Sequence, residues 1–340
     1  VERMGIRATA FDVAIPRRPS PWADWSALQR LRALFQSQRF DLVHSQTPKA
    51  GLLAMNAARS TGGPRRGHTF TGQVWATRRG AWRHILRSLD RRTAHHASAL
   101  LADSRAQADF LIREGVVAAE RIEVLHHGSI CGVDPQRFRP NAALRMKVRR
   151  EMGASERDTV ILFMGRLDRE KGVPELLVAF ERLAATRPAL RLWLVGPDEG
   201  AADALQAISP ALRARVAHPG ATTAPERFMA AADLLALPSH REGFPVTTLE
   251  AASCGIPTVA SRIYGLADAV IDEVTGLLHE VGSAESLERA LGRVVDDEAL
   301  RERLGRTARE RAHRDFDPDT IASALLDFYE RHGSMRTTGR

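Results

Sequence analysis

The chain has 340 residues, 44% of them hydrophobic, and carries a formal net charge of +8 at pH 7. This length suits two domains of ordinary size, and this composition is typical of a globular protein. The sequence contains no run of about 18 or more apolar residues, which excludes a membrane-spanning helix, and its two cysteines exclude a disulfide framework. We therefore expect a cytoplasmic protein without a secretion leader.

The first 140 residues alternate short apolar runs with helical segments, which indicates a parallel sheet built from strand-helix units. One helix is predicted over 25–38. Another begins at Ser104, a preferred N-cap residue, and ends near Gly115. No strand here is followed by the glycine-rich turn that normally opens such a unit, so the first domain is predicted to lack its beginning. The predicted strands are 6–11, 41–45, 68–71, 99–103 and 122–126.

Positive charge is concentrated in this first half. Residues 1–140 contain 22 Lys and Arg against 11 Asp and Glu, whereas the remainder contains 27 against 30. Between positions 65 and 92 there are eight arginines and a single acid, Asp90. This excess predicts a surface that favours anionic partners.

Within this stretch, residues 81–94 are predicted to form a basic amphipathic helix, because Trp82, Ile85, Leu86 and Leu89 recur at helical spacing. Three interpretations stay open. The apolar stripe packs on the domain core, as in an ordinary surface helix, or the helix lies on an anionic membrane, since arginines beside tryptophan suit the headgroup layer. Nucleic-acid binding is the third, but the sequence has no zinc spacing, RNP-like motif or recognition helix to support it.

After a linker at 139–141, the second half contains six predicted strands that alternate with helices, which makes a complete doubly wound unit. A last helix begins at Pro318. We expect one domain at 1–140, completed by the C-terminal helix 318–331, and a second domain at 141–317. The predicted strands of the second half are 159–164, 190–195, 215–218, 233–237, 257–260 and 276–279.

A glycine and two cations follow the first strand of the second half. The segment FMGRLDREKG contains Gly165, Arg166 and Lys171 and precedes a helix predicted over 174–185. Glycine lets the backbone approach a ligand closely, and open sheets bind ligands at the carboxyl ends of their strands. The segment therefore predicts a ligand site with two positive charges.

Two glutamates mark the turn and the helix that come after the fourth strand of this half. Glu242 lies in a turn predicted over 239–243, and Glu250 lies in a helix predicted over 245–253, which Pro245 opens. The start of this helix leaves free backbone amides and the positive end of the helix dipole beside Glu242. Ionised carboxylates only accept hydrogen bonds, so they suit the hydroxyls of a sugar or ribose better than a phosphate.

The segments FMGRLDREKG, PSHREGFP (238–245) and EAASCGIPTVAS (250–261) resemble the donor site of retaining glycosyltransferases of family 4, which have the two-domain GT-B fold. The resemblance covers essentially the whole chain. It implies an α/β protein with two doubly wound, Rossmann-like domains. It also implies that the first domain lacks about 40 residues, comprising its first strand-helix unit and part of the segment after that unit.

The same resemblance implies that the donor is a nucleotide sugar. Arg166 and Lys171 would neutralise its diphosphate, and Glu250 would accept hydrogen bonds from its ribose. Glu242 would orient its sugar, so Glu242, Arg166 and Lys171 are the catalytic candidates. Attack from the side of the leaving group retains the configuration without an enzyme nucleophile, and no metal or cofactor is expected. The full donor-binding set is Gly165, Arg166, Lys171, Gly196, Glu242, Gly243, Phe244, Pro245, Val246 and Glu250.

Three further segments resemble the branch of this family that builds capsule, O-antigen and related surface glycans on lipid carriers. They are VHSQTPKAG (43–51), HTFTGQVW (68–75) and SRIYGL (261–266). Thr71 stands where many family members have a histidine that contacts the reacting sugar, so that role is not carried over. By analogy, the acceptor-side candidates are His44, Lys49, Thr71 and Gly72.

These observations predict a transferase on the cytoplasmic face of the membrane that moves a sugar from a nucleotide, with UDP expected, to a polyprenyl-diphosphate-linked saccharide. The expected partners are a nucleotide sugar, a lipid-linked saccharide acceptor and an anionic membrane surface, with no nucleic acid. Two alternatives stay open. One is a sugar-nucleotide epimerase of the same fold, which should lack the EGFP helix start. The other is a shortened chain that binds the nucleotide sugar without transferring it.

Overall fold

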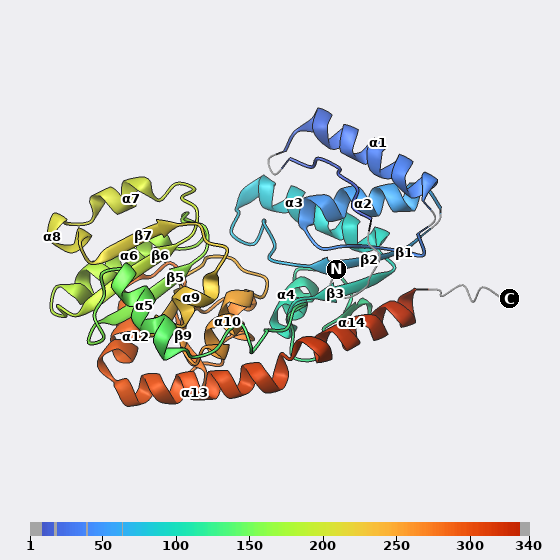
Figure 1. The fold of residues 1–340 in the computed structure, drawn as a ribbon. Helices are drawn as coiled ribbons and strands as arrows, with labels where there is room; N and C mark the ends of the chain where they lie inside the picture. The colour runs from blue at the N-terminus through green and yellow to red at the C-terminus, as the bar shows by residue number, and fades with distance from the viewer. Residues whose placement is uncertain (1–8, 17–18, 39, 63, 334–340) are drawn as a thin grey trace.

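The computed structural model describes residues 9–16, 19–38, 40–62 and 64–333. Two α/β domains lie side by side, the N-terminal one drawn in blue to green and the C-terminal one in green to orange (Figure 1). Each domain has a parallel sheet of its own, with helices packed against it. The prediction of two Rossmann-like α/β domains is therefore confirmed.

The N-terminal sheet has four parallel strands in the order β1-β2-β3-β4. The predicted strand at 122–126 is shorter in the structure and ends at Glu123; at His126 the φ of +45° is a left-handed conformation that does not belong to a strand. Of the predicted strand 6–11, residues 6–8 lie outside the described residues and residues 9–11 are in no strand. The strands are β1 Leu42–Ser45, β2 Arg65–Phe70, β3 Ala99–Ala102 and β4 Ile122–Glu123.

The helices of this domain begin where the sequence offers a start signal. Pro21 opens the first helix four residues before the predicted start, and Pro48 opens the second, because proline suits the first helical turn. The side chain of Ser104 caps the fourth helix by accepting a hydrogen bond from the Gln107 N–H at 3.1 Å, as expected. The helices are α1 Pro21–Ser37, α2 Pro48–Ser60, α3 Gly80–His96, α4 Arg105–Arg113 and the 3-10 turn Ala119–Arg121.

Helix α3 does not bury its apolar stripe. Trp82, Ile85 and Leu89 are 67%, 50% and 36% exposed, and only Leu86 of the stripe packs against the core. The interpretation of α3 as an ordinary surface helix held to the core by this stripe is therefore wrong. The residues that α3 buries are Asp90, Thr93 and Ala94.

The C-terminal sheet has six parallel strands in the order β10-β9-β8-β5-β6-β7. The chain builds β5, β6 and β7 in one direction and then returns to build β8, β9 and β10 in the other, so the order reverses between β5 and β8. All six strands were predicted to within two residues. They are β5 Thr159–Met164, β6 Leu190–Val195, β7 Val216–Gly220, β8 Leu234–Leu237, β9 Thr258–Ser261 and β10 Gly276–His279.

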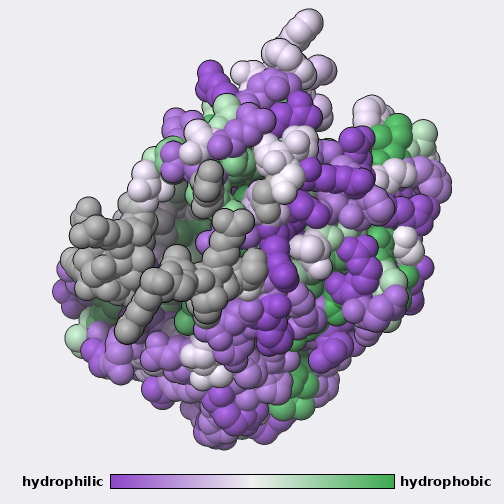
Figure 2. Space-filling model, turned by 90° about the vertical axis from the view of Figure 1, so that its right-hand side faces the viewer, coloured by the Kyte–Doolittle hydropathy of each residue, from purple (hydrophilic) through white to green (hydrophobic). Residues whose placement is uncertain are grey.

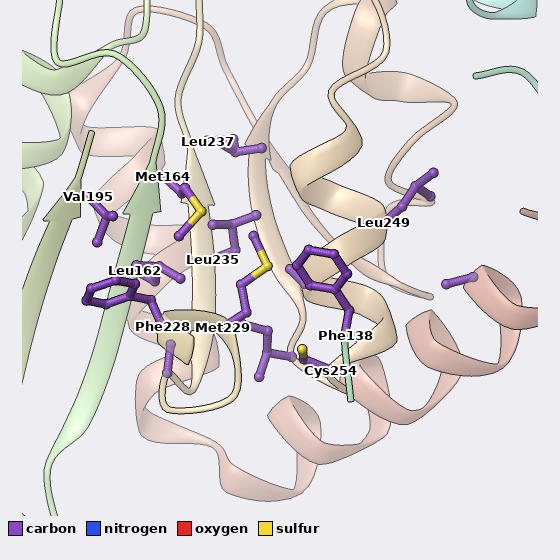
Figure 3. Close-up of a cluster of buried hydrophobic side chains, with 14 of the residues drawn as sticks. Phe138, Leu162, Met164, Val195, Phe228, Met229, Leu235, Leu237, Leu249 and Cys254 are labelled. Atoms are coloured by element: carbon purple, nitrogen blue, oxygen red, sulfur yellow. The ribbon is translucent and has the colours of Figure 1, made fainter. Parts of the chain in front are cut away.

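Apolar side chains cover both faces of this sheet. On one face, side chains from β5, β6 and β8 gather with Phe228, Met229 and Cys254 (Figure 3). On the other face, Phe163 and Phe180 belong to a second buried cluster. The helices of the domain are α5 Ala142–Glu151, α6 Val173–Ala184, α7 Ala202–Ala207, α8 Pro210–Arg213, α9 Pro225–Met229, α10 Val246–Ser253, α11 Tyr264–Ala267, α12 Ala284–Asp296 and α13 Glu298–Asp315.

The last helix returns to the N-terminal domain. Helix α13 runs along the C-terminal domain, and α14, Pro318–His332, lies against the N-terminal domain (Figure 1). Phe328 of α14 is buried in a cluster with Leu101 of β3. A Cβ added to Gly132 would lie 2.4 Å from the Cα of Pro318, so the two connections between the domains touch.

The surface is mainly polar, and its exposed apolar side chains are unevenly distributed. On the face shown in Figure 2, hydrophilic residues predominate and hydrophobic ones gather in separate patches. The exposed large hydrophobic side chains include three tryptophans, all in the first 90 residues: Trp22, Trp25 and Trp82. None of the described helices is long and apolar enough to cross a membrane.

Candidate active site

A cavity of about 580 Å³ lies between the two domains. On its C-terminal side it is lined by the loops after β5 and β8, the strands between which the order reverses, and doubly wound sheets bind ligands at this point. The N-terminal side is formed by the start of α2 and by the loop after β2. The volume is that of a small-molecule site. The charged residues of its lining are Lys49, Arg166, Glu170, Lys171, Arg241 and Glu242.

Glycines bring the loops of the C-terminal side together. Gly165 and Gly196 have φ values of +155° and +151°, and a Cβ added to Gly196 would lie 1.8 Å from the Gly165 carbonyl oxygen. Gly172, with a φ of +71°, approaches Pro238 in the same way, because its added Cβ would lie 2.1 Å from the Pro238 oxygen. Only glycine allows such contacts at these backbone conformations. Gly165 and Gly196 thus place the loop of Arg166 and are not themselves in the cavity lining.

Lys171 and Glu242, which come from separate motifs, form an ion pair. The Nζ of Lys171 lies 2.6 Å from Oε1 of Glu242, and Ser239 Oγ donates to the same oxygen at 2.8 Å. The two side chains are 20% and 11% exposed, so water screens the pair only weakly. Both hydrogen bonds go to Oε1, and none of the described residues donates a hydrogen bond to Oε2 of Glu242. That oxygen can therefore accept a hydrogen bond from a ligand hydroxyl.

Arg166 lies in the same lining and is also paired. Its guanidinium bonds to Glu199 at 2.9 Å and to Asp168. Asp168 also accepts a hydrogen bond from the Lys171 backbone N–H at 2.9 Å, which ties the loop together. Both predicted cations are therefore at the cavity. Each holds a carboxylate that an anionic ligand must displace or share.

Arg241 is a third cation of the cavity that the sequence did not single out. It donates to the carbonyl oxygen of Gly72 and to Oε2 of Glu170, both at 2.9 Å, and so links the two domains. Burial alone would raise the pKa of Glu170, but the guanidinium groups of Arg241, Arg78 and Arg166 lower it below its usual value. In the sequence, the only indication that Arg241 belongs to the site is that it directly precedes Glu242.

The two domains touch backbone to backbone beside the cavity. A Cβ added to Gly72 would lie 2.8 Å from the carbonyl carbon of Glu242, and one added to Gly243 would lie 2.4 Å from Oδ2 of Asp103. Asp103, directly after β3, is buried, and the Phe244 N–H donates to its carboxyl group. No partner among the described residues reaches Oδ1 of Asp103. Burial raises the pKa of Asp103 to about 7.

Tyr264, from the SRIYGL segment, makes another contact between the domains. Its hydroxyl accepts a hydrogen bond from the Gln73 N–H at 3.0 Å, and its ring stacks on Phe110 at a centroid distance of 4.4 Å. On the same side, the Ala106 N–H donates to Asp268 at 2.8 Å. The segment thus holds the domains together and does not line the cavity.

The other predicted donor residues lie at the start of α10 or on it. Pro245 is the N-cap residue, so α10 begins one residue later than predicted, at Val246. The ring of Phe244 is buried and packs on Phe316 at 5.4 Å, which leaves its backbone as the group near the cavity. Burial raises the pKa of Glu250, and the guanidinium of Arg137 partly opposes this. The members of the donor set outside the cavity lining are Gly165, Gly196, Phe244, Pro245, Val246 and Glu250.

Three of the four acceptor-side candidates line the cavity: Lys49, Thr71 and Gly72. Lys49 forms an ion pair with Asp24 at 2.6 Å. His44 lies outside the lining, because its ring bonds to the hydroxyls of Tyr329 at 2.7 Å and Thr69 at 2.8 Å. Over the described ranges, no three His, Cys, Asp or Glu side chains are grouped so that they could hold a metal ion.

Two glycosyltransferase families match the chain, one in each domain. The family described as "Glycosyltransferase Family 4" matches residues 6–137. The family described as "Glycosyl transferases group 1" matches residues 145–311, which include both motif loops of the cavity. Together the two matches span most of the chain.

The curated relatives are named as glycosyltransferases, and their names state different products or substrates. The capsular polysaccharide biosynthesis glycosyltransferase CapM of Staphylococcus aureus is 26% identical over 323 residues, which is 94% of this chain and 84% of CapM. The D-inositol 3-phosphate glycosyltransferase of Xylanimonas cellulosilytica is 33% identical over 254 residues, or 71% of this chain. The match spans only 58% of that relative.

A solved structure shows the same fold. HepE of Anabaena, in complex with UDP, matches with a TM-score of 0.74 and 23% identity over 89% of this chain and 81% of HepE. At this identity the likeness establishes the GT-B fold and nothing finer. The chain is therefore a glycosyltransferase with the GT-B fold, whose C-terminal domain matches group 1 and whose N-terminal domain matches family 4.

Proposed function

We propose that the chain transfers a sugar, with retention of configuration, from a UDP-sugar to a lipid-linked saccharide in the synthesis of capsule, O-antigen or exopolysaccharide. The observation that carries the proposal is the cavity at the switch point of the C-terminal sheet, where Lys171, Arg166 and Glu242 meet. The UDP complex of HepE and the capsular role in the name of CapM support the choice of donor and product.

Lys171 and Arg166 are proposed to stabilise the leaving group. As the bond between the anomeric carbon and the phosphate oxygen breaks, negative charge builds on the departing diphosphate. Fixed positive groups at that position lower the barrier; a single hydrogen-bond donor of an oxyanion hole contributes about 3 to 4 kcal/mol. Glu242 holds the Lys171 ammonium at the cavity before the donor binds, so the diphosphate meets a cation that is already positioned and shares it with Glu242.

Glu242 and Glu250 are proposed to orient the donor. Oε2 of Glu242 accepts a hydrogen bond from a sugar hydroxyl, and Glu250 accepts hydrogen bonds from the ribose. The acceptor hydroxyl forms its bond to the anomeric carbon from the side that the diphosphate leaves. Its proton passes to the departing phosphate oxygen, so no enzyme nucleophile is required in this scheme.

We propose that no metal ion takes part, because three cations of the chain already lie at the cavity: Arg166, Lys171 and Arg241. Treatment with EDTA is therefore expected to leave the rate of transfer unchanged. A rate that falls with EDTA and recovers with Mg²⁺ would contradict this part of the proposal.

The N-terminal domain is proposed to lie on the anionic inner face of the cytoplasmic membrane. Helix α3 exposes Trp82 and Ile85 on the same helix as a row of arginines, which suits a helix in the headgroup layer. Anionic liposomes are expected to retain the protein at low salt, and the double substitution Trp82→Gln and Ile85→Gln should weaken retention. Leu326→Gln in α14, whose 60% exposure lies between those of Trp82 and Ile85, is the control. Failure of liposomes to retain the protein would refute membrane docking.

A thermal-shift screen of nucleotide sugars tests the donor site. A ligand present at about 100 times its Kd stabilises the folded chain by about 2.7 kcal/mol, so the right donor raises the unfolding temperature. No shift with any UDP- or GDP-sugar would contradict the proposal. Product formed with a lipid-linked acceptor then separates a transferase from a chain that only binds. The family matches and the EGFP helix start both favour transfer over epimerisation.

A further inference from the structure

A second hollow lies in the N-terminal domain, between α1, α2 and α3. Its volume is about 280 Å³, and its lining is mainly apolar. Trp75, buried to 1% exposure, and Leu52 of α2 contribute to it, and Leu86 and Leu89 line it from α3. We call this hollow the α3 groove.

The α3 groove adjoins the cavity between the domains. Pro48, Lys49 and Val74 line both hollows. The two hollows therefore share a border formed by these residues. This border places the groove on the acceptor side of the site.

The surroundings of the groove expose apolar side chains to solvent. Asp24 of α1 lines the groove, and its neighbours in α1, Trp22 and Trp25, are 85% and 60% exposed. On α3, Ile85 and Leu89 are 50% and 36% exposed. Large apolar side chains that gather at the surface in this way mark an interaction site.

The acids of the groove are compensated within the chain. The carboxylate of Asp24 pairs with Lys49 at 2.6 Å. Asp90 accepts a hydrogen bond from the indole N–H of Trp75 at 2.7 Å, and burial raises its pKa to about 6. Asp24 therefore has a paired cation, and Asp90 is buried at 7% exposure, which keeps its carboxylate away from the solvent side of the groove.

Arginines follow the groove residue Trp75 along the chain, and the guanidinium of Arg83 lies 5.2 Å from the centre of the Trp75 ring. Arg83 and Arg87 of α3 hold Glu114 at 2.6 and 2.8 Å. Arg78 and Arg79, directly before α3, are exposed, and no ion pair joins them to a carboxylate of the described residues. An apolar groove with exposed arginines beside it complements an apolar chain that carries phosphate groups.

We propose that the α3 groove binds the first segment of the lipid chain of the acceptor, while its diphosphate lies near Arg78 and Arg79 and its saccharide enters the cavity. The proposal rests on the proposed function, because it assumes an acceptor on a lipid carrier. A volume of about 280 Å³ suits a segment of a lipid chain and not a whole lipid. The remainder of the chain would pass the exposed tryptophans of α1 toward the bilayer.

Calorimetric titration of the whole chain with farnesyl diphosphate and with pyrophosphate, at equal low salt, tests this proposal. Both ligands carry the same diphosphate, and only one carries an apolar chain. We expect farnesyl diphosphate to bind at least tenfold more tightly. Equal affinities would overturn the proposal.

Two variants locate the binding. Leu89→Gln makes the lining polar at a position that is already partly exposed, and Leu86→Trp fills the groove with apolar bulk. Each is expected to weaken the binding of farnesyl diphosphate at least fivefold without changing the affinity for pyrophosphate. Leu326→Gln should change neither affinity. Thermal unfolding of each variant verifies that it is folded. If both variants are folded and their affinity for farnesyl diphosphate is unchanged, the lipid chain binds elsewhere and the assignment is overturned.

Titration of UDP into the same samples separates this proposal from the proposed function. If UDP binds but farnesyl diphosphate binds no better than pyrophosphate, the groove assignment fails and the donor site stands. If farnesyl diphosphate binds more tightly than pyrophosphate and UDP does not bind, the donor proposal fails and the groove assignment stands.

Discussion

The two domains arrange their positive charges in different ways. In the C-terminal domain the cations are paired before any ligand arrives: Lys171 with Glu242 at 2.6 Å and Arg166 with Glu199 at 2.9 Å. In the N-terminal domain, Arg78 and Arg79 are exposed, next to a helix whose apolar stripe faces solvent. The contrast indicates that the C-terminal side is preorganised for chemistry. The N-terminal side instead presents a surface whose partner lies outside the chain.

The largest expected effect comes from removing the preorganised cation. Lys171→Ala should lower turnover by a factor of about 100 to 1,000, because the departing diphosphate loses a fixed positive charge. Release of the nucleotide from the donor measures this. Arg182→Ala, which removes an exposed arginine paired with Glu288, is the matched control and should have little effect. A loss of less than tenfold for Lys171→Ala would show that the C-terminal side is not preorganised as described.

A smaller effect is expected where the two domains touch. In Gly72→Ala the new Cβ would lie 2.8 Å from the carbonyl carbon of Glu242, so the backbones have to separate. Turnover should fall at least tenfold, while the affinity for UDP, which depends on the C-terminal domain, stays within about twofold. Steady-state rates and calorimetry measure the two quantities.

The control for this variant is Gly67→Ala in β2. Its added Cβ finds its nearest neighbour, a side-chain atom of His44, at 3.4 Å, an ordinary contact. If Gly72→Ala turns over as fast as Gly67→Ala, the close approach of the two backbones has no part in the reaction.

The smallest expected effect concerns Asp103 and pH. Burial raises the pKa of Asp103 from 3.8 to about 7, so folding favours its protonated form. The stability that this contributes is complete below pH 3.8 and is lost as the pH rises through 7. The amide side chain introduced by Asp103→Asn does not ionise. The wild type should therefore lose at least about 1 kcal/mol relative to this variant between pH 5 and 8.

Urea unfolding at a series of pH values measures this difference. Asp90, whose pKa burial also raises, is present in both proteins, so its contribution cancels. A difference that stays constant from pH 5 to pH 8 would mean that Asp103 does not titrate in this range.

The parts of the molecule that the sequence predicted well have local causes. The strands of the C-terminal sheet are short apolar runs because both faces are buried, and such runs are visible without knowledge of the fold. The two motifs come directly after strands, and the carboxyl ends of parallel strands meet at one edge. This geometry, together with the resemblance of both motifs to one donor site, led us to expect Lys171 and Glu242, 71 positions apart, in one site.

The parts that the sequence did not predict depend on the other domain. Arg241 bonds to Gly72 across 169 positions, and Asp103 meets the amide of Phe244, so neither residue has a local pattern. The stripe on α3 has the same helical spacing whether it packs on a core or faces solvent, and only the structure separates the two cases. The role of the glycines that bring the loops together is likewise visible only in the structure, where the loops contact each other.

The donor site is tested most directly by the affinity for UDP. We predict that UDP binds the chain in calorimetry and that Glu250→Ala raises its Kd at least tenfold, because hydrogen bonds to a charged group contribute about 1.5 to 3 kcal/mol. Glu285→Ala, at an exposed position of α12, is the control and should leave the Kd unchanged. If UDP does not bind, or if Glu250→Ala binds it as well as the wild type does, the nucleotide does not lie where we place it.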